Sequence, residues 1–155
     1  MKKHYSVIWL LLFIFVGCGQ VAVEPNPAPP PPEVTDDYDL AIVSVDFDPA
    51  LQGNRLPVSD SYAVLVALEN RGLLTAYNAT VSATLRRSSD GAVMLEGSRT
   101  VRELAPGAII VVRIEPEGSI PQTQATYDLT VRAKPLPNET ILSNNTRSFT
   151  IRVIP

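Results

Sequence analysis

The chain contains very few of the side chains on which most catalytic and metal sites depend. Its 155 residues include one cysteine, one histidine and one tryptophan. The single cysteine, Cys18, has no partner for an intramolecular disulfide. The only histidine, His4, lies in an N-terminal segment that we expect to be removed on export. A Ser-His-Asp triad, a Cys-His pair and a histidine zinc site are therefore excluded from the mature chain.

The remaining side chains offer no better basis for catalysis. No stretch matches the glycine-rich phosphate loop, GXXXXGK followed by Ser or Thr. Glu115 and Glu117 share one face of an expected strand, and we interpret them as a solvated strand end rather than as the carboxylate pair of a glycosidase. We expect the protein not to be an enzyme and to hold no cofactor.

The charge of the chain also excludes one class of partner. There are 13 basic and 16 acidic side chains, and loss of Lys2 and Lys3 on export would leave 11 basic against the same 16 acidic ones. Nucleic acid binding requires dense patches of Lys and Arg, which this mildly acidic chain does not offer. We expect no nucleic-acid partner.

The N-terminus has the organisation of an export signal. Lys2 and Lys3 precede ten uninterrupted apolar residues at positions 7–16, and the small Gly17 follows. Ten residues rise about 15 Å as a helix, which is half of a bilayer's hydrocarbon core. We therefore predict a cleaved signal peptide at residues 1–17. The alternative is an uncleaved anchor, which would have to recruit residues 17–23, including Gln20.

Cys18 follows this segment directly, in the sequence FVGC at residues 15–18. The sequence resembles a bacterial lipobox, although Phe15 stands where that motif prefers Leu. The resemblance implies cleavage before Cys18 and attachment of a diacylglycerol to its sulfur, which would anchor the protein in a membrane. The alternative is a secreted protein whose cysteine is incidental. No Asp follows the cysteine, which favours the outer membrane if the source is Gram-negative.

A proline-rich stretch separates Cys18 from the rest of the chain. Residues 24–33 read EPNPAPPPPE, with six prolines in ten residues. Such a run adopts extended polyproline II, and at about 3.1 Å per residue the linker could reach on the order of 55 Å. We interpret residues 18–37 as the lipidated cysteine and a tether. A ligand for proline-recognition domains is the alternative.

Residues 38–155 alternate apolar and polar side chains with a period of two, which is typical of half-buried strands. Residues 39–47 alternate as well but slip phase between Ile42 and Val43, which predicts a bulge in an edge strand. Turn sequences separate the runs, among them 88–91 (SSDG) and 105–107 (APG). The predicted fold is all-β: an immunoglobulin-like antiparallel β-sandwich of about seven strands. The alternating runs are 62–69, 79–85, 110–114, 127–133 and 149–153.

Five short motifs occur in this body in a recognisable order. They are 39–42 (DLAI), 68–72 (LENRG), 104–107 (LAPG), 127–129 (YDL) and, as the last, 138–139 (NE) followed by 143–146 (SNNT). The order resembles the CARDB domain, the cell-adhesion-related domain found in bacteria, although prolines interrupt the loop at 132–138. The resemblance implies an immunoglobulin-like sandwich, an envelope or extracellular location, and a binding or architectural role without catalytic residues.

The motif residues also have structural interpretations. Gly72 and Gly107 suit turns that a side chain would strain. Asn144 and Asn145 are expected to hydrogen-bond local backbone before the last strand. For Tyr127 we favour a tyrosine-corner role, with its hydroxyl bonded to upstream backbone.

Two kinds of ligand stay open. Asp36, Asp37 and Asp39 cluster where the domain begins and are weak candidates for a calcium site, because oxygen ligands are all that calcium requires. Tyr38 and Tyr77 are the only tyrosines expected to be exposed as a sugar platform. The sequence thus predicts a lipid-anchored envelope protein that contacts a protein or polymer of unknown identity, for adhesion or a structural role. The alternative is a module that binds carbohydrate or calcium.

Overall fold

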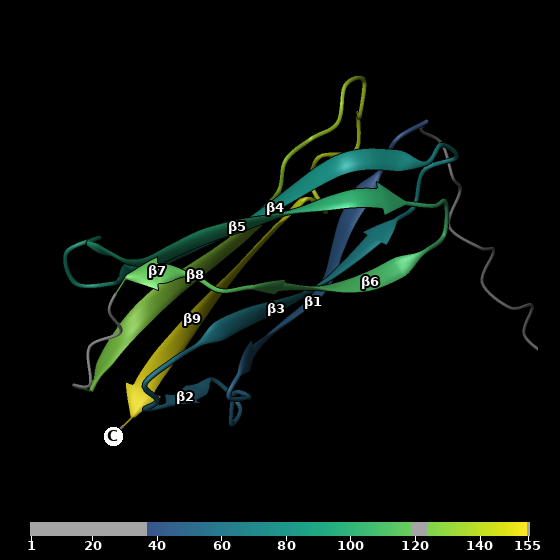
Figure 1. Cartoon of the computed structure of the whole chain (residues 1–155). Coiled ribbons are helices and arrows are strands. Elements are labelled where there is room, and N and C mark those ends of the chain that lie inside the picture. Colours follow the sequence, from purple (N-terminus) through teal and green to yellow (C-terminus); the bar gives the residue numbers. More distant parts are fainter. Residues whose placement is uncertain (1–36, 119–123, 155) are drawn as a thin grey trace, which may run out of the picture. The chain divides into compact units, whose positions relative to one another are not determined.

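The computed structural model of the chain describes residues 37–118 and 124–154. Within these residues there are nine β-strands and no helix (Figure 1). The strands are β1 (Leu40–Asp48), β2 (Arg55–Pro57), β3 (Ala63–Asn70), β4 (Ala76–Arg87), β5 (Val93–Leu104), β6 (Ile109–Ile114), β7 (Glu117–Gly118), β8 (Ala125–Ala133) and β9 (Thr146–Ile154).

The strands form two sheets. One sheet has three antiparallel strands in the order β1-β3-β6, and the other has six in the order β2-β9-β8-β4-β5-β7. The larger sheet is antiparallel except where β2 pairs with β9. Seven strands have six residues or more, while β2 and β7 are short additions. The predicted all-β sandwich of about seven strands is therefore confirmed.

The side chains between the sheets form one core. Inward and outward side chains of β3, β4, β6 and β8 alternate as predicted, and most of the inward ones are buried, although Ile110 of β6 is only partly buried. Burial of each large aliphatic side chain contributes about 1.5–3 kcal/mol to folding. Phe149 departs from the prediction: it pairs with the buried Leu129, yet its own side chain is 40% exposed. The largest buried side chains are Tyr127, Phe47, Leu40, Ile42, Leu56, Leu68, Leu85 and Leu104.

The predicted bulge in the first strand is confirmed. The register of β1 against β3 shifts between Ile42 and Ser44, so that Val43 has no partner and is exposed. β1 lies at the edge of the three-stranded sheet, where bulges are common. Ile42 and Phe47 are five positions apart, so strict alternation would place them on opposite faces, and the shift is what keeps both in the core.

The predicted turns are also present. Gly91 and Gly107 have φ angles of +70° and +71°, which favour glycine, and lie between β4 and β5 and between β5 and β6. Gly72 is constrained for a different reason. A Cβ on Gly72 would lie 2.7 Å from the backbone oxygen of Asp37 and 2.8 Å from the backbone nitrogen of Asp39.

Buried polar side chains connect the start of β1 to the loop between β8 and β9. Glu139 Oε1 accepts hydrogen bonds from the backbone N–H of Leu40 (2.7 Å) and from Asn145 Nδ2 (2.8 Å). Asn144 Nδ2 donates to Asp39 Oδ1 at 2.7 Å. The expectation that Asn144 and Asn145 bond local backbone is therefore wrong for their side-chain amides, because carboxylates brought in by the fold accept from both.

The tyrosine prediction has a similar outcome. Tyr127 is fully buried, and its hydroxyl has no hydrogen-bond partner among the described residues. Tyr62 instead makes the kind of bond predicted for Tyr127. Its hydroxyl donates to the backbone oxygen of Pro57 (2.8 Å), five residues upstream, and accepts from the N–H of Ser59 (2.6 Å).

Candidate interaction surface

The sandwich is open along one side, between β5 and β6. These strands are consecutive in the sequence, but β5 belongs to the six-stranded sheet and β6 to the three-stranded sheet. Among the described residues, β6 pairs with β3 alone, and the outer edge of β5 is paired only at Leu95 and Glu96, with β7. Two strand edges with unpaired backbone groups therefore border the same opening.

A groove of about 340 Å³ lies in this opening. At one end the strands approach closely, because a Cβ on Gly97 would lie 2.9 Å from both Ile114 Cγ2 and Pro116 Cα. At the other end the turn that contains Gly107 joins the two strands. The groove is thus bounded at both ends, and we call it the β5–β6 groove.

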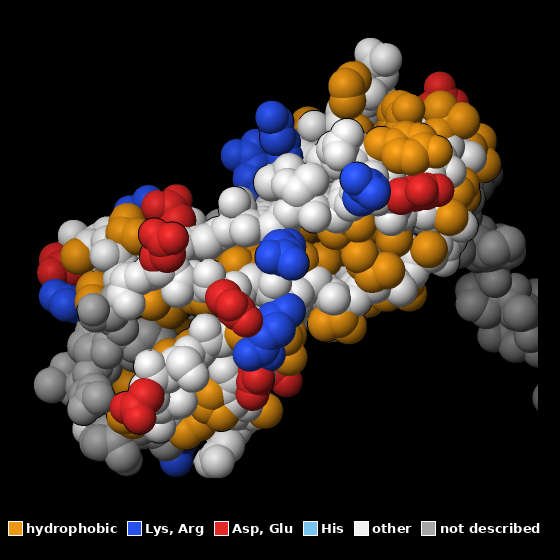
Figure 2. Space-filling model, in the orientation of Figure 1, with side chains coloured by type: hydrophobic (Ala, Val, Ile, Leu, Met, Phe, Trp, Pro, Cys, Tyr) orange, Lys and Arg blue, Asp and Glu red, His pale blue; other side chains and the backbone are white. Residues whose placement is uncertain are grey.

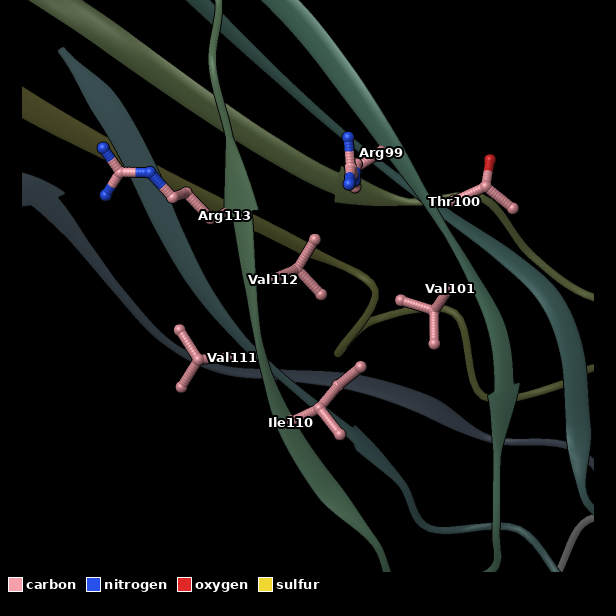
Figure 3. Close-up of a pocket in the computed structure, with 7 residues that line it drawn as sticks. All are labelled: Arg99, Thr100, Val101, Ile110, Val111, Val112 and Arg113. Atoms are coloured by element: carbon pink, nitrogen blue, oxygen red, sulfur yellow. The ribbon is translucent and has the colours of Figure 1, made fainter.

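The walls of the β5–β6 groove are mostly apolar. Val101 points into it from β5, and Ile110 and Val112 point into it from β6 (Figure 3). Figure 2 shows hydrophobic side chains at the surface between these strands. Val101 and Ile110 are only partly buried, so that an extended chain in the groove would remove more of their apolar surface from water.

One cation lies in the groove without a partner. Arg99 is opposite the buried Val81 on the inner face of the larger sheet, yet its side chain is exposed because the sandwich is open there (Figure 3). Its guanidinium makes no hydrogen bond or ion pair with any other described residue. It is therefore available to an anionic group that enters the groove.

The neighbouring cation is already neutralised. Arg113 lies on β6 at the border of the groove, with its side chain directed away from Val101 (Figure 3). Its Nη1 is 2.6 Å from Asp48 Oδ2 and its Nε is 3.4 Å from Glu115 Oε1. These hydrogen bonds, first that to Asp48 and then that to Glu115, raise the pKa of Arg113 above its ordinary value. Glu115 thus partners an arginine, whereas the exposed Glu117 lies in β7.

The outer face of β6 adds exposed apolar surface beside the groove. Ile109 is 56% exposed and Val111 is 68% exposed, the largest value among the large hydrophobic side chains of the described residues. In the three-stranded sheet they lie opposite Glu69 and Ala67 of β3. An edge strand with exposed apolar side chains is a site at which another strand can add.

The two calcium candidates that the structure describes, Asp37 and Asp39, differ in their surroundings. Asp39 is buried, and its carboxylate is bonded to Asn144 as described above. Asp37 is exposed, and its backbone oxygen accepts from the N–H of Leu74. Asp36 lies outside the described residues, as do Cys18 and the predicted signal peptide. Within residues 37–118 and 124–154, no three His, Cys, Asp or Glu side chains come together in a way that could hold a metal ion.

The two candidates for a sugar platform differ in exposure. Tyr77 is 57% exposed, whereas Tyr38 is half-buried. The described part of the chain also contains no helix long and apolar enough to cross a membrane.

A role that the sequence did not reveal belongs to Asn70, which is fully buried at the end of β3. Its Nδ2 donates to the backbone oxygens of Leu74 (2.8 Å) and Leu104 (2.9 Å), and its Oδ1 accepts from the N–H of Gly72 (3.0 Å). Its backbone oxygen accepts from the N–H of Gly107. Asn70 therefore fixes the turn that ends the β5–β6 groove. Its position in the LENRG motif was the available signal.

Comparisons with known proteins define the class of fold. No protein-family model matches the chain, and no curated protein matches it. Among solved structures, a domain of a protein named as a cell surface protein of Methanosarcina acetivorans is 24% identical, with a TM-score of 0.56 over 76% of this chain and 92% of that one. The CARDB domain of a Pyrococcus furiosus protein, in complex with di-metal ions, is 16% identical, with a TM-score of 0.51 over 76% of this chain and 89% of that one.

These similarities establish the fold. The two sheets of this chain are arranged as in CARDB immunoglobulin-like domains, which confirms the fold that the motif order implied.

Proposed function

We propose that the protein is a lipid-anchored component of the cell envelope whose non-catalytic CARDB-like domain holds a partner protein by strand addition at the β5–β6 groove. In this mode an extended segment of the partner pairs with a free strand edge, and pockets beside the edge select its side chains. The observation that carries the proposal is one apolar groove, which contains Arg99 and is bordered by edges of β5 and β6; among the described residues, Arg99 has no ion-pair partner and these edges have no pairing strand beyond β7 at Leu95 and Glu96.

The chemistry of the groove defines the partner segment. Side chains of an extended segment alternate between two faces, so that one face would meet Val101, Ile110 and Val112. An acidic side chain on this face would neutralise Arg99. We therefore expect an extended segment with apolar residues at alternate positions and one acidic residue among them.

The groove is tested with two synthetic peptides that have valine at alternate positions and differ at one inward position, Glu in one and Lys in the other. Fluorescence anisotropy with the full chain should show binding of the Glu peptide and much weaker binding of the Lys peptide. Arg99→Glu should reverse this preference. Equal binding of both peptides, or a preference that Arg99→Glu leaves unchanged, would overturn the proposed mode.

A matched experiment in cells locates the surface. A photo-crosslinking residue at Val111, beside the groove, should give an adduct with another protein that Arg99→Glu abolishes. The same residue at Thr84, on the outer face of the larger sheet, should give none with that protein. The proposal would be wrong if the Thr84 position gave the same adduct.

The lipid anchor requires its own experiment. Its support is the apolar run at 7–16, Gly17 and the position of Cys18. Cells labelled with a fatty-acid analogue should label the wild-type chain, whereas Cys18→Ala should stay unlabelled as a larger precursor. A soluble, unlabelled product from both chains would remove the anchor and the outer-membrane location, and would leave a secreted domain.

The second candidate function is a ligand-binding module, and the di-metal complex of the Pyrococcus furiosus CARDB domain is the observation that favours it. Calcium should then raise the melting temperature of the full chain, and Asp37→Asn should reduce that rise. An unchanged melting temperature at saturating calcium would exclude a calcium site.

A further inference from the structure

The outer face of the six-stranded sheet is rich in hydroxyl groups. In the register of β9, β8, β4 and β5, one row across the face reads Ser148, Thr130, Thr84 and Glu96. The next row reads Thr146, Arg132, Ser82 and Ser98. The ten Ser and Thr side chains on this face are Thr80, Ser82, Thr84, Ser98, Thr100, Thr126, Thr130, Thr146, Ser148 and Thr150.

Few of these hydroxyls are used within the protein. Thr80 and Thr100 are hydrogen-bonded to each other at 3.1 Å, and Thr150 donates to Asp128 at 3.0 Å. Ser82 makes a long bond of 3.4 Å to a backbone oxygen. The other hydroxyls of the face make no side-chain hydrogen bond within the described part of the chain, so that most of the face presents donors and acceptors to a ligand.

The same face concentrates positive charge. Five cations lie on it and three acids, Asp128, Glu96 and the Glu117 that pairs with Glu96 at the β7 edge, although the chain as a whole has more acidic than basic side chains. None of the five forms an ion pair with another described residue. Lys134 follows β8, and its backbone N–H bonds the backbone oxygen of Thr80, so the register of β8 against β4 continues to it. It therefore lies opposite Thr80 on the outer face. The cations are Arg55, Arg86, Arg132, Lys134 and Arg152.

We propose that this face, which we call the hydroxyl–cation face, binds an acidic polysaccharide. Free hydroxyls can exchange hydrogen bonds with sugar hydroxyls, and the unpaired cations can bind the carboxylates of uronate residues. The side chains at the centre of the face, on β8 and β4, are all polar, so that nothing there would insert into a membrane. The inference rests on a different surface from the β5–β6 groove and does not depend on it.

The test is electrophoresis of the full chain, purified in a non-ionic detergent, through native gels that contain polygalacturonate. The protein should be retarded by polygalacturonate and not by neutral dextran, and added salt should weaken the retardation. The double variant Arg132→Glu with Lys134→Glu should bind about tenfold more weakly. Its melting temperature shows whether it folds. If it does not fold, the double variant Arg132→Gln with Lys134→Gln is tested in its place.

Arg99→Glu is the matched control, because it removes an unpaired cation from the groove and leaves the hydroxyl–cation face intact. It should retain binding to polygalacturonate. The inference is overturned if the protein is not retarded, if the Arg132 and Lys134 variants are retarded as strongly as the wild type, or if Arg99→Glu weakens binding equally. Tighter binding to anionic lipid vesicles than to polygalacturonate would assign the face to lipid headgroups and also overturn it.

Discussion

The Glu139 carboxylate accepts a hydrogen bond from the backbone N–H of Leu40, which lies 99 residues earlier in the chain, at 2.7 Å. The same carboxylate accepts from Asn145 Nδ2 and from the N–H of Leu136. Burial of a carboxylate is costly unless hydrogen bonds replace its lost water, and these three donors do so. Glu139 therefore joins the first long strand to the loop before the last one.

Removal of this carboxylate should destabilise the domain. Glu139→Ala leaves the N–H of Leu40 buried without an acceptor, and we expect a loss of about 2–3 kcal/mol of unfolding free energy. Urea unfolding followed by circular dichroism measures the loss. Glu117→Ala, in the exposed β7, is the control and should change stability by less than about 0.5 kcal/mol. Equal losses in the two variants would show that the Glu139 bonds contribute nothing.

Tyr62 gives a prediction that depends on pH. Burial, as the largest cause, raises the pKa of Tyr62 above its ordinary value. A raised pKa in the folded state means that the stabilisation is complete below the unfolded pKa of about 10 and is lost as the pH rises through the folded value. Tyr62→Phe should cost about 1 kcal/mol at neutral pH, because the bonds to Pro57 and Ser59 are lost.

The difference between Tyr62→Phe and the wild type should shrink in alkaline solution, and melting curves across this range would show it. Tyr77→Phe, which removes the hydroxyl of an exposed ring, is the control and should leave the melting temperature at neutral pH unchanged. A constant difference at all pH values would mean that the Tyr62 hydroxyl does not titrate as its surroundings require.

Two glycines should respond differently to substitution. Gly72→Ala places a Cβ against the backbone of Asp37 and Asp39, and backbone cannot move aside as a flexible side chain can. A Cβ on Gly107 would have no atom within 4 Å, so Gly107→Ala should lower the free energy of unfolding only because of its positive φ, by about 1–2 kcal/mol. Gly107→Asn should cost less than Gly107→Ala, since Asn tolerates this conformation, whereas Gly72→Asn should cost at least as much as Gly72→Ala. Thermal melting of the four variants would contradict this account if both positions ranked Ala and Asn alike.

The sequence sufficed for the fold because side-chain alternation and turn chemistry are local properties. The phase slip at Val43 was readable for the same reason, since a bulge displaces the pattern of its own strand. Partners that the fold brings together were not readable. Asn144 and Asp39 are 105 residues apart, and no local rule connects them. Which tyrosine hydroxyl bonds upstream backbone, that of Tyr127 or that of Tyr62, likewise depends on the path of residues 57–59, which supply the partners of Tyr62.

The β5–β6 groove could not be predicted for a topological reason. The turn at residues 105–107 predicts that the strands on either side of it are neighbours, and neighbours of this kind usually pair. Here β5 and β6 enter different sheets, so that the turn opens the sandwich instead of closing a hairpin. From the sequence alone, Arg99 is interpreted as a solvated residue on a strand. It becomes a candidate for binding only because its strand edge faces a groove.

The ion pairs of Arg113 give a prediction about binding rather than stability. Asp48 and Glu115 neutralise Arg113 beside the groove, and all three side chains are at least half exposed. Exposed pairs of this kind contribute little to folding, so Asp48→Asn with Glu115→Gln should leave the melting temperature unchanged in high salt.

The same change frees the Arg113 cation near Arg99 and should tighten binding of the Glu peptide by about threefold at low salt. Anisotropy titrations at two salt concentrations measure this, with Asp90→Asn, in an ion pair with Arg87 at the distant β4–β5 turn, as the control. Unchanged or weaker binding by the double variant would mean that acidic segments do not reach this side of the groove.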